Sequence, residues 1–276
     1  MSWAAVAKKD FQDAVRSRAL WGLSVVFLLF ALVTTYAYVE FPDMLAGGDQ
    51  SGVGLALYLA GIAGLFVSLA AILVAYRALA GERESGSIKL LLGLPHTRTD
   101  VVLGKVIGRS GVLMLPILVA FVLAGVYAAL SLDPFGMADY LIFVLMTLVL
   151  ALAYVCIVVG ISGSTGSTSR ASALAVGFFL LFELLWDGIS IGVVYVANGF
   201  SLPATFPDWL FVVNQIPPSS AYSTALFAVI PDAMGSGGAG GIDAFYGTPW
   251  LGVVMLAFWI VVPLAIGLRQ FNAADL

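Results

Sequence analysis

Few side chains in this sequence carry the chemistry of catalysis or metal binding, and they stand apart from one another. Cys156 is the single cysteine and His96 the single histidine. A structural or catalytic metal site needs several such ligands at short spacing, and neither residue has them. Residues 235–240 match the pattern Gly-x-Gly-x-x-Gly, but the flanking sequence lacks the strand and helix of a dinucleotide site. We therefore expect no catalytic residue, metal or cofactor in this chain.

Two carboxylates lie within an otherwise apolar stretch. Glu183 and Asp187 are four residues apart, so a helix would place them on one face. If this stretch spans a membrane, such residues are costly and by default indicate function on the protein interior. Both are therefore candidates for a substrate path. The structural alternative is that Asp187 reaches the outer interface and a hydrogen bond keeps Glu183 neutral.

Charged residues also gather in one segment between two apolar stretches. Residues 77–84 are expected to extend the preceding helix, and they end in the alternating charges Glu82, Arg83 and Glu84. Gly86 then breaks that helix, because glycine is among the poorest helix formers. The segment therefore predicts a charged helical end followed by a turn.

A second, short helix is predicted directly after this turn. Three apolar residues recur at positions i, i+3 and i+4, which are Ile88, Leu91 and Leu92. Gly93 and Pro95 end this helix after about two turns. Polar residues that favour an N-cap follow, namely Thr97, Thr99 and Asp100. The apolar face of so short a helix must be buried against membrane, protein or a partner.

The composition identifies the setting in which these residues act. Of 276 residues, 61% are hydrophobic and 10% are charged, and the mean hydropathy is +1.05. Soluble domains have about 25% charged residues, so a water-soluble enzyme, a secreted disulfide module and a disordered tail are excluded. Long apolar runs predict an all-α integral membrane protein with six spans. The predicted spans are 20–38, 55–76, 110–130, 140–162, 171–196 and 250–268.

The basic residues predict the orientation of the spans. With six spans, all twelve Lys and Arg residues fall on the same side, and the segments 39–54, 131–139 and 197–249 contain none. Because cytoplasmic loops are rich in Lys and Arg, we expect both termini to be cytoplasmic, in the cell membrane. Before the first span, apolar residues recur at helical spacing, namely Trp3, Ala7, Phe11 and Ala14. They predict an amphipathic helix on the inner membrane surface; a plain charged extension is the alternative.

The external segment 197–249 contains two apolar stretches that are too short to span. They cover Trp209–Val213 and Ala221–Ile230 and are separated by prolines. We expect them to form re-entrant or interfacial helices at the outer mouth of the bundle.

The segment between the second and third spans resembles the corresponding loop of ABC-2 type permeases, the membrane subunits of exporter-type ATP-binding cassette transporters. The resemblance rests on an ordered pattern: Glu82, Arg83, Glu84, Gly86, Ile88, Leu91, Leu92, Pro95, Arg98, Gly104 and Lys105. In that family the short helix is the coupling helix, which docks in a groove of the ATPase subunit. The resemblance implies ATPase coupling by Gly86–Leu94, with Glu82–Glu84 as the adjoining gate and Pro95 and Arg98 in the same motif.

The resemblance also covers the architecture of the whole chain and implies a single transmembrane domain, residues 1–276. It implies a dimer of permeases and separate ATPase subunits, which bind ATP and Mg. Residues 183–187 and the Pro217-Pro218 step resemble the permease branch associated with nitrous oxide reductase maturation. That branch more often has Asn-Pro where this chain has Pro217-Pro218.

The sequence thus predicts the permease subunit of an ATP-driven exporter, with a lipid, amphiphile, drug or maturation factor as substrate. Its partners are ATPase subunits, a second permease copy and the lipid bilayer, and no nucleic acid. One alternative is a secondary transporter, which requires intramembrane ionisable groups and repeat symmetry. The other is a membrane scaffold or assembly factor without transport activity.

Overall fold

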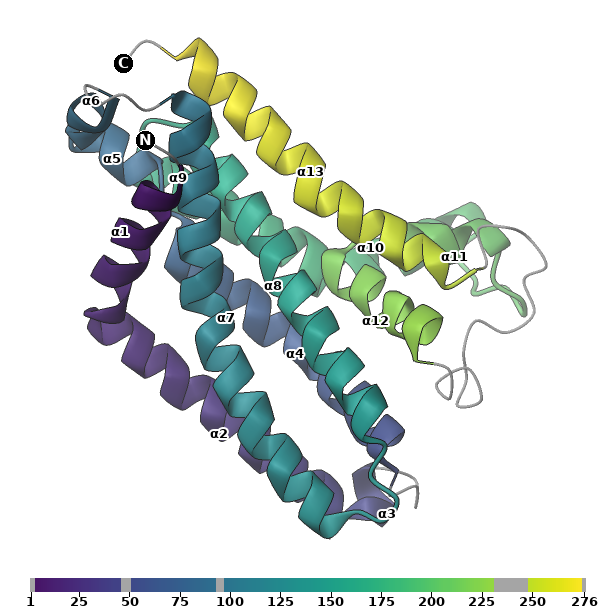
Figure 1. Ribbon diagram of the computed structural model, residues 1–276. Coiled ribbons are helices and arrows are strands. Elements are labelled where there is room, and N and C mark those ends of the chain that lie inside the picture. Colours follow the sequence, from purple (N-terminus) through teal and green to yellow (C-terminus); the bar gives the residue numbers. More distant parts are fainter. Residues whose placement is uncertain (1–2, 46–50, 93–96, 231–247, 275–276) are drawn as a thin grey trace.

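The computed structural model describes residues 3–45, 51–92, 97–230 and 248–274 (Figure 1). These residues form helices and turns, with no strand among them, as expected for the all-α class. Six helical stretches are long and apolar enough to cross a membrane, which confirms the predicted number of spans. The helices are α1 Trp3–Val15, α2 Arg18–Glu40, α3 Pro42–Leu45, α4 Gly52–Ala75, α5 Ala80–Glu84, α6 Ser87–Leu92, α7 Arg98–Ser131, α8 Met137–Ser164, α9 Thr168–Phe179, the π-helix η1 Leu180–Leu185, α10 Trp186–Ala197, α11 Asp208–Asn214, α12 Pro218–Val229 and α13 Trp250–Ala273.

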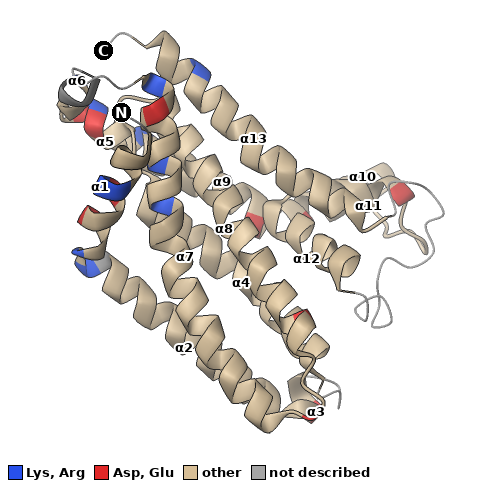
Figure 2. Cartoon of the chain, in the orientation of Figure 1, with Lys and Arg blue, Asp and Glu red and all other residues tan. Residues whose placement is uncertain are grey.

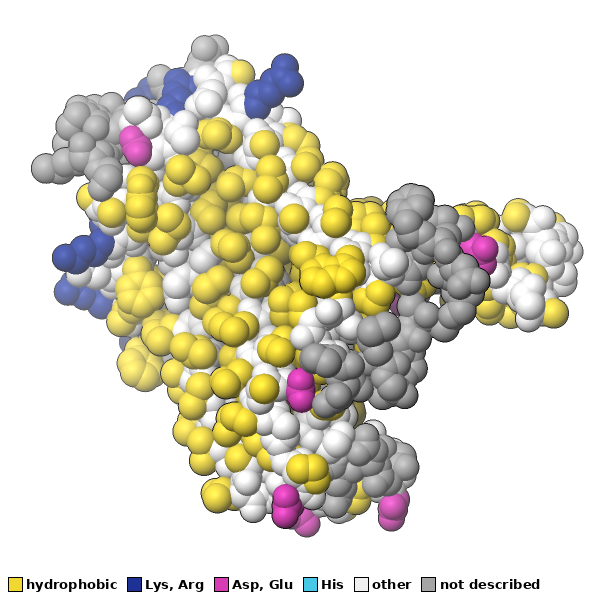
Figure 3. Space-filling model, turned by 45° about the vertical axis from the view of Figure 1, so that its right-hand side comes forward, with side chains coloured by type: hydrophobic (Ala, Val, Ile, Leu, Met, Phe, Trp, Pro, Cys, Tyr) yellow, Lys and Arg dark blue, Asp and Glu magenta, His cyan; other side chains and the backbone are white. Residues whose placement is uncertain are grey.

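Charged and apolar residues occupy different zones of the bundle. Figure 2 shows the basic residues gathered around α1, α5 and the start of α7, together with the far end of α13. In Figure 3 apolar side chains cover the middle of the visible face, and charged side chains lie at its rims. A broad apolar belt between polar ends is what a bilayer requires of the proteins that span it.

α8 forms the centre of the bundle. The helices α4, α7, α12 and α13 pack around it, and 67% of its most apolar stretch is buried. α8 and α13 approach closely where two glycines face each other, because a Cβ atom on Gly267 would lie 2.5 Å from the Cα atom of Gly160. Small residues at such crossings let helix backbones come into contact within a membrane.

The N-terminal helix α1 packs along the first turns of α7. The contact again depends on glycine: a Cβ atom on Gly104 would lie 2.6 Å from the Cβ atom of Val6, and one on Gly108 would lie 3.1 Å from the carbonyl oxygen of Ala7. α1 is therefore held by protein on one side. Its position on the inner membrane surface stays a prediction.

The fifth span is built from three pieces, α9, η1 and α10, where the sequence predicts one continuous helix. The π-helix η1 contains Glu183 and interrupts the α-helical hydrogen bonding in the middle of the span. Only 17% of the most apolar stretch of this span is buried, so most of its surface faces away from the rest of the chain. π-helical turns inside α-helices occur frequently at functional sites.

The predicted short helices after the fifth span are present as α11 and α12. α12 is buried among α4, α8 and α13, and the hydroxyl groups of its Tyr222 and of Thr147 on α8 lie 2.7 Å apart. α11 is bound to α10, because the Trp186 indole donates to the carbonyl of Val213 at 2.8 Å. α12 thus packs inside the bundle, whereas α11 lies beside α10, the C-terminal part of the fifth span (Figure 1). Their re-entrant or interfacial position stays a prediction.

Candidate functional site

The loop between the second and third spans is fastened to the bundle by one buried serine. We expected residues 77–84 to extend the helix of the second span, but α4 ends at Ala75 and α5 is a separate helix. The Ser162 hydroxyl on α8 accepts hydrogen bonds from the backbone N–H groups of Leu79 and Ala80 at 3.1 and 3.0 Å. It also donates to the carbonyl of Tyr76 at 2.8 Å. Ser162 therefore satisfies backbone groups that a continuous helix would pair internally, which explains why α4 stops here.

The three alternating charges of α5 each contact a different helix. The Glu82 carboxylate lies 2.5 Å from the ammonium group of Lys105 on α7. Arg83 donates to the carbonyl of Gly163, near the C-terminal end of α8, at 3.2 Å. The Glu84 carboxylate accepts from the backbone N–H of Thr168, the first residue of α9, at 3.0 Å.

These contacts match the polarity of the helix ends that they meet. A cation is favourable at the C-terminal end of a helix and an anion at the N-terminal end, because of the exposed carbonyl and N–H groups there. Arg83 and Glu84 follow this rule at α8 and α9. The motif Glu82–Glu84 therefore links α5 to three spans at once.

A buried group of ion pairs connects this motif to the N-terminal helix. The ammonium group of Lys105 lies 2.8 Å from the carboxylate of Asp10 on α1, and the side chains of both residues are less than 10% exposed. Arg109 contacts the same carboxylate at 2.8 Å through Nε and donates to the carbonyl of Val74 at 2.8 Å. With Glu82, the group contains two acids and two bases, so its charges balance.

Our sequence analysis did not identify Asp10 or Ser162. Asp10 lies three residues after Ala7, on the apolar stripe of α1. A charged residue on that stripe is the sequence feature that could have indicated a buried ion pair. Lys105 belonged to the quoted motif, but the sequence did not indicate its partners. Ser162 carries no sequence signal that distinguishes it from its neighbouring serines.

The short helix predicted after Gly86 is present as α6. Gly86 has a φ of +74°, a left-handed conformation that glycine adopts without strain, and it turns the chain between α5 and α6. The Ile88 side chain is 1% exposed and belongs to the main apolar core, whereas Ser87 and Lys89 are exposed. Ile88 therefore anchors α6 to the bundle. The side chains of Leu91 and Leu92, and the whole of Pro95, lie outside the described residues.

Arg98 begins α7 and binds the far end of the chain. Its guanidinium group donates to the carbonyls of Phe271, Asn272 and Ala274 at 2.8, 2.8 and 3.0 Å. The predicted N-cap is confirmed beside it, because the Thr97 side chain and Asp100 form a capping box. Arg98 thus holds the C-terminal end of α13 at the start of α7.

The intramembrane carboxylate Glu183 lies in η1 and has polar partners. The Tyr154 hydroxyl on α8 donates a hydrogen bond to it, and Ser219 at the start of α12 interacts with it as well. Ser219 also contacts α4, because a Cβ atom on Gly64 would lie 2.6 Å from the Cβ atom of Ser219. Glu183 is therefore placed where α4, α8, α12 and the fifth span meet.

Asp187 is close enough to act on Glu183 by its charge, but no hydrogen bond among the described residues joins its side chain to this polar group. Its side chain is exposed, and its backbone carbonyl accepts a hydrogen bond from Ser190 at 3.0 Å. The part of the chain that the structure describes contains no group of three or more His, Cys, Asp and Glu residues able to hold a metal ion. Cys156 is buried in α8, and His96 lies outside the described residues.

Six candidate spans, a pair of short helices between the second and third spans and a short buried helix between the fifth and sixth define a polytopic membrane protein of the permease type. The profile of the family described as "ABC-2 family transporter protein" matches residues 4–276, and the chain belongs to this family. The chain is 29% identical to the "Probable ABC transporter permease protein NosY" of Pseudomonas aeruginosa, over 97% of this chain and 96% of that protein. It is also 29% identical to the protein of the same name from Stutzerimonas stutzeri, over 76% of each chain. These relatives bear out the resemblance to the nitrous oxide reductase branch that the sequence suggested.

Proposed function

We propose that this chain is the membrane subunit of an ATP-driven exporter, in which two permease copies form the pathway and separate subunits hydrolyse ATP. The observation that carries the proposal is the α5–α6 unit at the basic end of the bundle, which is bonded directly to α7, α8 and α9 and, through Lys105, to α1. Such a unit suits the transmission of force from a partner. The sequence contains no Gly-x-x-x-x-Gly-Lys-Ser/Thr motif, so ATP and Mg are assigned to the partner.

The bonds of α5 define the route of coupling. α6 docks on the ATPase, with Leu91 and Leu92 in the docking face, and Ile88 transmits its displacement to the core. Glu82 then moves α7 and α1 through Lys105, while Arg83 and Glu84 move the junction of α8 and α9. Charge-assisted hydrogen bonds are short and directional, so they transmit small displacements better than apolar contacts do.

Glu183 is proposed to lie on the substrate path, with Asp187 at its outer end. The support is the π-helix that carries Glu183 and the meeting of four elements around it. The low burial of the fifth span supports the second permease copy, which would cover part of that exposed surface. The substrate remains a lipid, amphiphile, drug or maturation factor.

The protein is placed in the cell membrane with both ends in the cytoplasm. Support comes from the basic residues at the end of the bundle that carries α1, α5 and the end of α13, as the positive-inside rule requires. This orientation directs α6 toward the compartment that contains ATP.

Copurification tests the proposal directly. A tagged chain is extracted in mild detergent, and an ATP-binding cassette subunit is expected to come with it. Leu91→Asp is expected to abolish copurification and ATPase stimulation without preventing membrane insertion. The matched control is Leu202→Asp, in the exposed segment after α10, which should retain both.

The substrate path is tested in the same assay. Glu183→Gln is expected to leave assembly intact and to lower ATP turnover in vesicles several-fold.

Wild-type copurification and stimulation by the Leu91→Asp protein would contradict the coupling route. A wild-type chain that inserts but brings no ATPase would favour a secondary transporter or a scaffold.

A further inference from the structure

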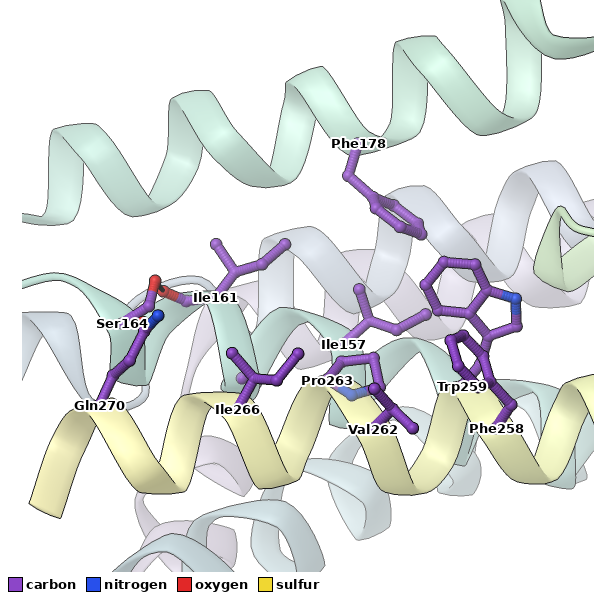
Figure 4. A pocket seen from close by; sticks show the side chains of 11 residues that line it. Ile157, Ile161, Ser164, Phe178, Phe258, Trp259, Val262, Pro263, Ile266 and Gln270 are labelled. Atoms are coloured by element: carbon purple, nitrogen blue, oxygen red, sulfur yellow. Dashed lines mark hydrogen bonds between the residues drawn. The ribbon is translucent and has the colours of Figure 1, made fainter.

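A narrow apolar groove runs along the bundle between α9 and α13 (Figure 4). Its volume is about 350 Å³. Ile157 and Ile161 of α8 form its floor, and Phe178 of α9 faces Trp259 of α13 at one end. One wall is α9 of the fifth span and the other is α13, the sixth span. These are the least buried of the six spans, with 17% and 22% of their most apolar stretches buried. The groove therefore opens on a side of the bundle that the described part of the chain leaves uncovered.

The groove has an apolar end and a polar end. Among the described residues that line the groove, the side chains of Ser164, the last residue of α8, and of Gln270, near the end of α13, are the hydrophilic ones, and both are labelled at the same end of the groove in Figure 4. The exposed Arg269 adjoins Gln270 in the sequence. From Phe258 to Gln270 the groove follows α13 for about 18 Å at 1.5 Å per residue. One leaflet of a bilayer core is about 15 Å thick, so the groove matches the depth of a single leaflet.

We propose that this groove binds one acyl chain of an anionic phospholipid from the cytoplasmic leaflet. The chain lies along Ile161 and Ile266 and ends against Trp259, and the headgroup lies beside Gln270 and Arg269. The basic charge at the polar end favours an anionic headgroup over a neutral one. The inference requires the proposed orientation but not the ATPase.

The dimensions of the groove favour a lipid over a protein helix. A helix of the same length and about 10 Å in diameter would occupy about 1,400 Å³, several times the volume of the groove. A single hydrocarbon chain is the narrow, apolar and flexible occupant that the surrounding bilayer supplies.

Quenching of tryptophan fluorescence tests the site. Trp259 is 8% exposed, so bulk lipid reaches it poorly, and a chain seated in the groove would contact it. In a variant that keeps Trp259 and has the other five tryptophans replaced by Phe, vesicles of phosphatidylglycerol with brominated acyl chains are expected to reduce its emission at least twofold. Brominated phosphatidylcholine at the same mole fraction should quench less.

Two substitutions distinguish lipid bound in the groove from lipid that contacts the rest of the protein surface. Ile161→Phe fills the floor and is expected to remove at least half of the quenching. Leu174→Phe, on the exposed face of α9 outside the groove, should leave it unchanged. Should the single-tryptophan protein fail to fold, the wild-type chain is crosslinked to a photoreactive phosphatidylglycerol instead. Adducts are then expected on residues 157–164 and 258–270 in excess over the exposed face of α2.

Three results would overturn the inference. The first is unquenched Trp259 emission under conditions in which a Trp21-only protein, exposed on α2, is quenched. The second is quenching that appears only after a dimer dissociates, which would assign the groove to the second copy. The third is equal quenching by the two lipids, which would refute the anionic headgroup. In the crosslinking arm, adducts no more frequent on the groove than on α2 would overturn it.

Discussion

The side chain of Asp10 is the point at which the buried ion pairs of α1, α5 and α7 converge. Its two oxygens bind Lys105 and Arg109, which α7 presents one turn apart, and Lys105 also binds Glu82. Buried charges are tolerated only when they are paired, and removing one partner leaves another charge uncompensated. The N-terminal helix is therefore joined to α5 through Lys105 by charge, in addition to its packing on α7.

Asp10→Asn is expected to destabilise the protein by about 3–5 kcal/mol, because it leaves excess positive charge buried between α1 and α7. The unfolding midpoint of the purified protein in detergent measures this. Asp13→Asn serves as the control, since Asp13 is an exposed acid on the same helix. Equal losses in the two variants would show that the pairing contributes nothing.

At the scale of single residues, the sequence selected candidate residues but did not indicate their contact partners. The resemblance selected Glu82, Arg83 and Glu84, but their contacts depend on how α7, α8 and α9 pack, which no local pattern encodes. Lys105 and Asp10 are 95 residues apart in the chain. A hydrogen bond to Glu183 belonged to the structural alternative for that residue, and Tyr154 donates one in the structure.

The break between α4 and α5 is held in place by a residue of a third helix, Ser162 of α8. No glycine or proline occurs between Ala75 and Ala80, so the sequence gives no sign that the helix stops. Ser162 of α8 binds the freed backbone groups instead. The orientation of α5, and therefore of α6, is set by α8.

Ser162→Ala is expected to loosen α5 without disrupting the spans. The substitution leaves two buried N–H groups without a partner, at a cost of about 1–3 kcal/mol each. Hydrogen exchange at Leu79 and Ala80 should therefore accelerate by about tenfold or more, since 1.4 kcal/mol corresponds to a factor of ten. Ser164→Ala, at an exposed hydroxyl of the same helix, should leave exchange at those amides unchanged.

At the contact between α1 and α7, packing decides whether replacing a glycine by alanine raises or lowers the stability of the protein. Alanine in place of a helical glycine usually stabilises a helix by about 0.5–1 kcal/mol. Gly104→Ala should instead lower the unfolding midpoint, because its Cβ atom would lie 2.6 Å from that of Val6. Gly61→Ala is the control, as nothing lies within 4 Å of its Cβ position. A rise in the midpoint for Gly104→Ala would mean that α1 is not packed as described.

Elements with a strong hydropathy signal were predicted accurately, and those defined by packing were not. All six predicted spans coincide with helices of the structure, since a long apolar run has few other stable forms in a membrane. The π-helix was missed because Leu180–Leu185 contains only ordinary helix-forming residues. α11 and α12 were anticipated from short apolar stretches, but the burial of α12 among three spans follows from tertiary packing.

At the scale of the whole molecule, the uneven distribution of charge predicts a fixed orientation in the membrane. The two ends of the bundle carry different charges, with basic residues near α5 and acidic residues near α3 and α11 (Figure 2). The membrane potential and anionic cytoplasmic lipids both favour the basic end inside the cell.

Single cysteines introduced into a Cys156→Ala protein test this orientation. Ser201→Cys should react with a membrane-impermeant maleimide on intact cells, because it is exposed beyond the outer end of α10. Ser85→Cys, between α5 and α6, should react only after permeabilisation. Labelling in the reverse order would refute the orientation, and with it the accessibility of α6 to an ATPase.

The contact of Arg98 with the end of α13 also bears on how the protein is made. Arg98 and Phe271 are 173 residues apart in the chain. A ribosome adds about 5–20 residues per second, so Arg98 emerges roughly 9–35 s before its acceptor carbonyls exist. Throughout that interval the loop between the second and third spans lacks one of its native supports. Biogenesis of this loop is thus completed only when α13 enters the membrane, so a nascent chain still lacking that helix would present it in an unfinished form.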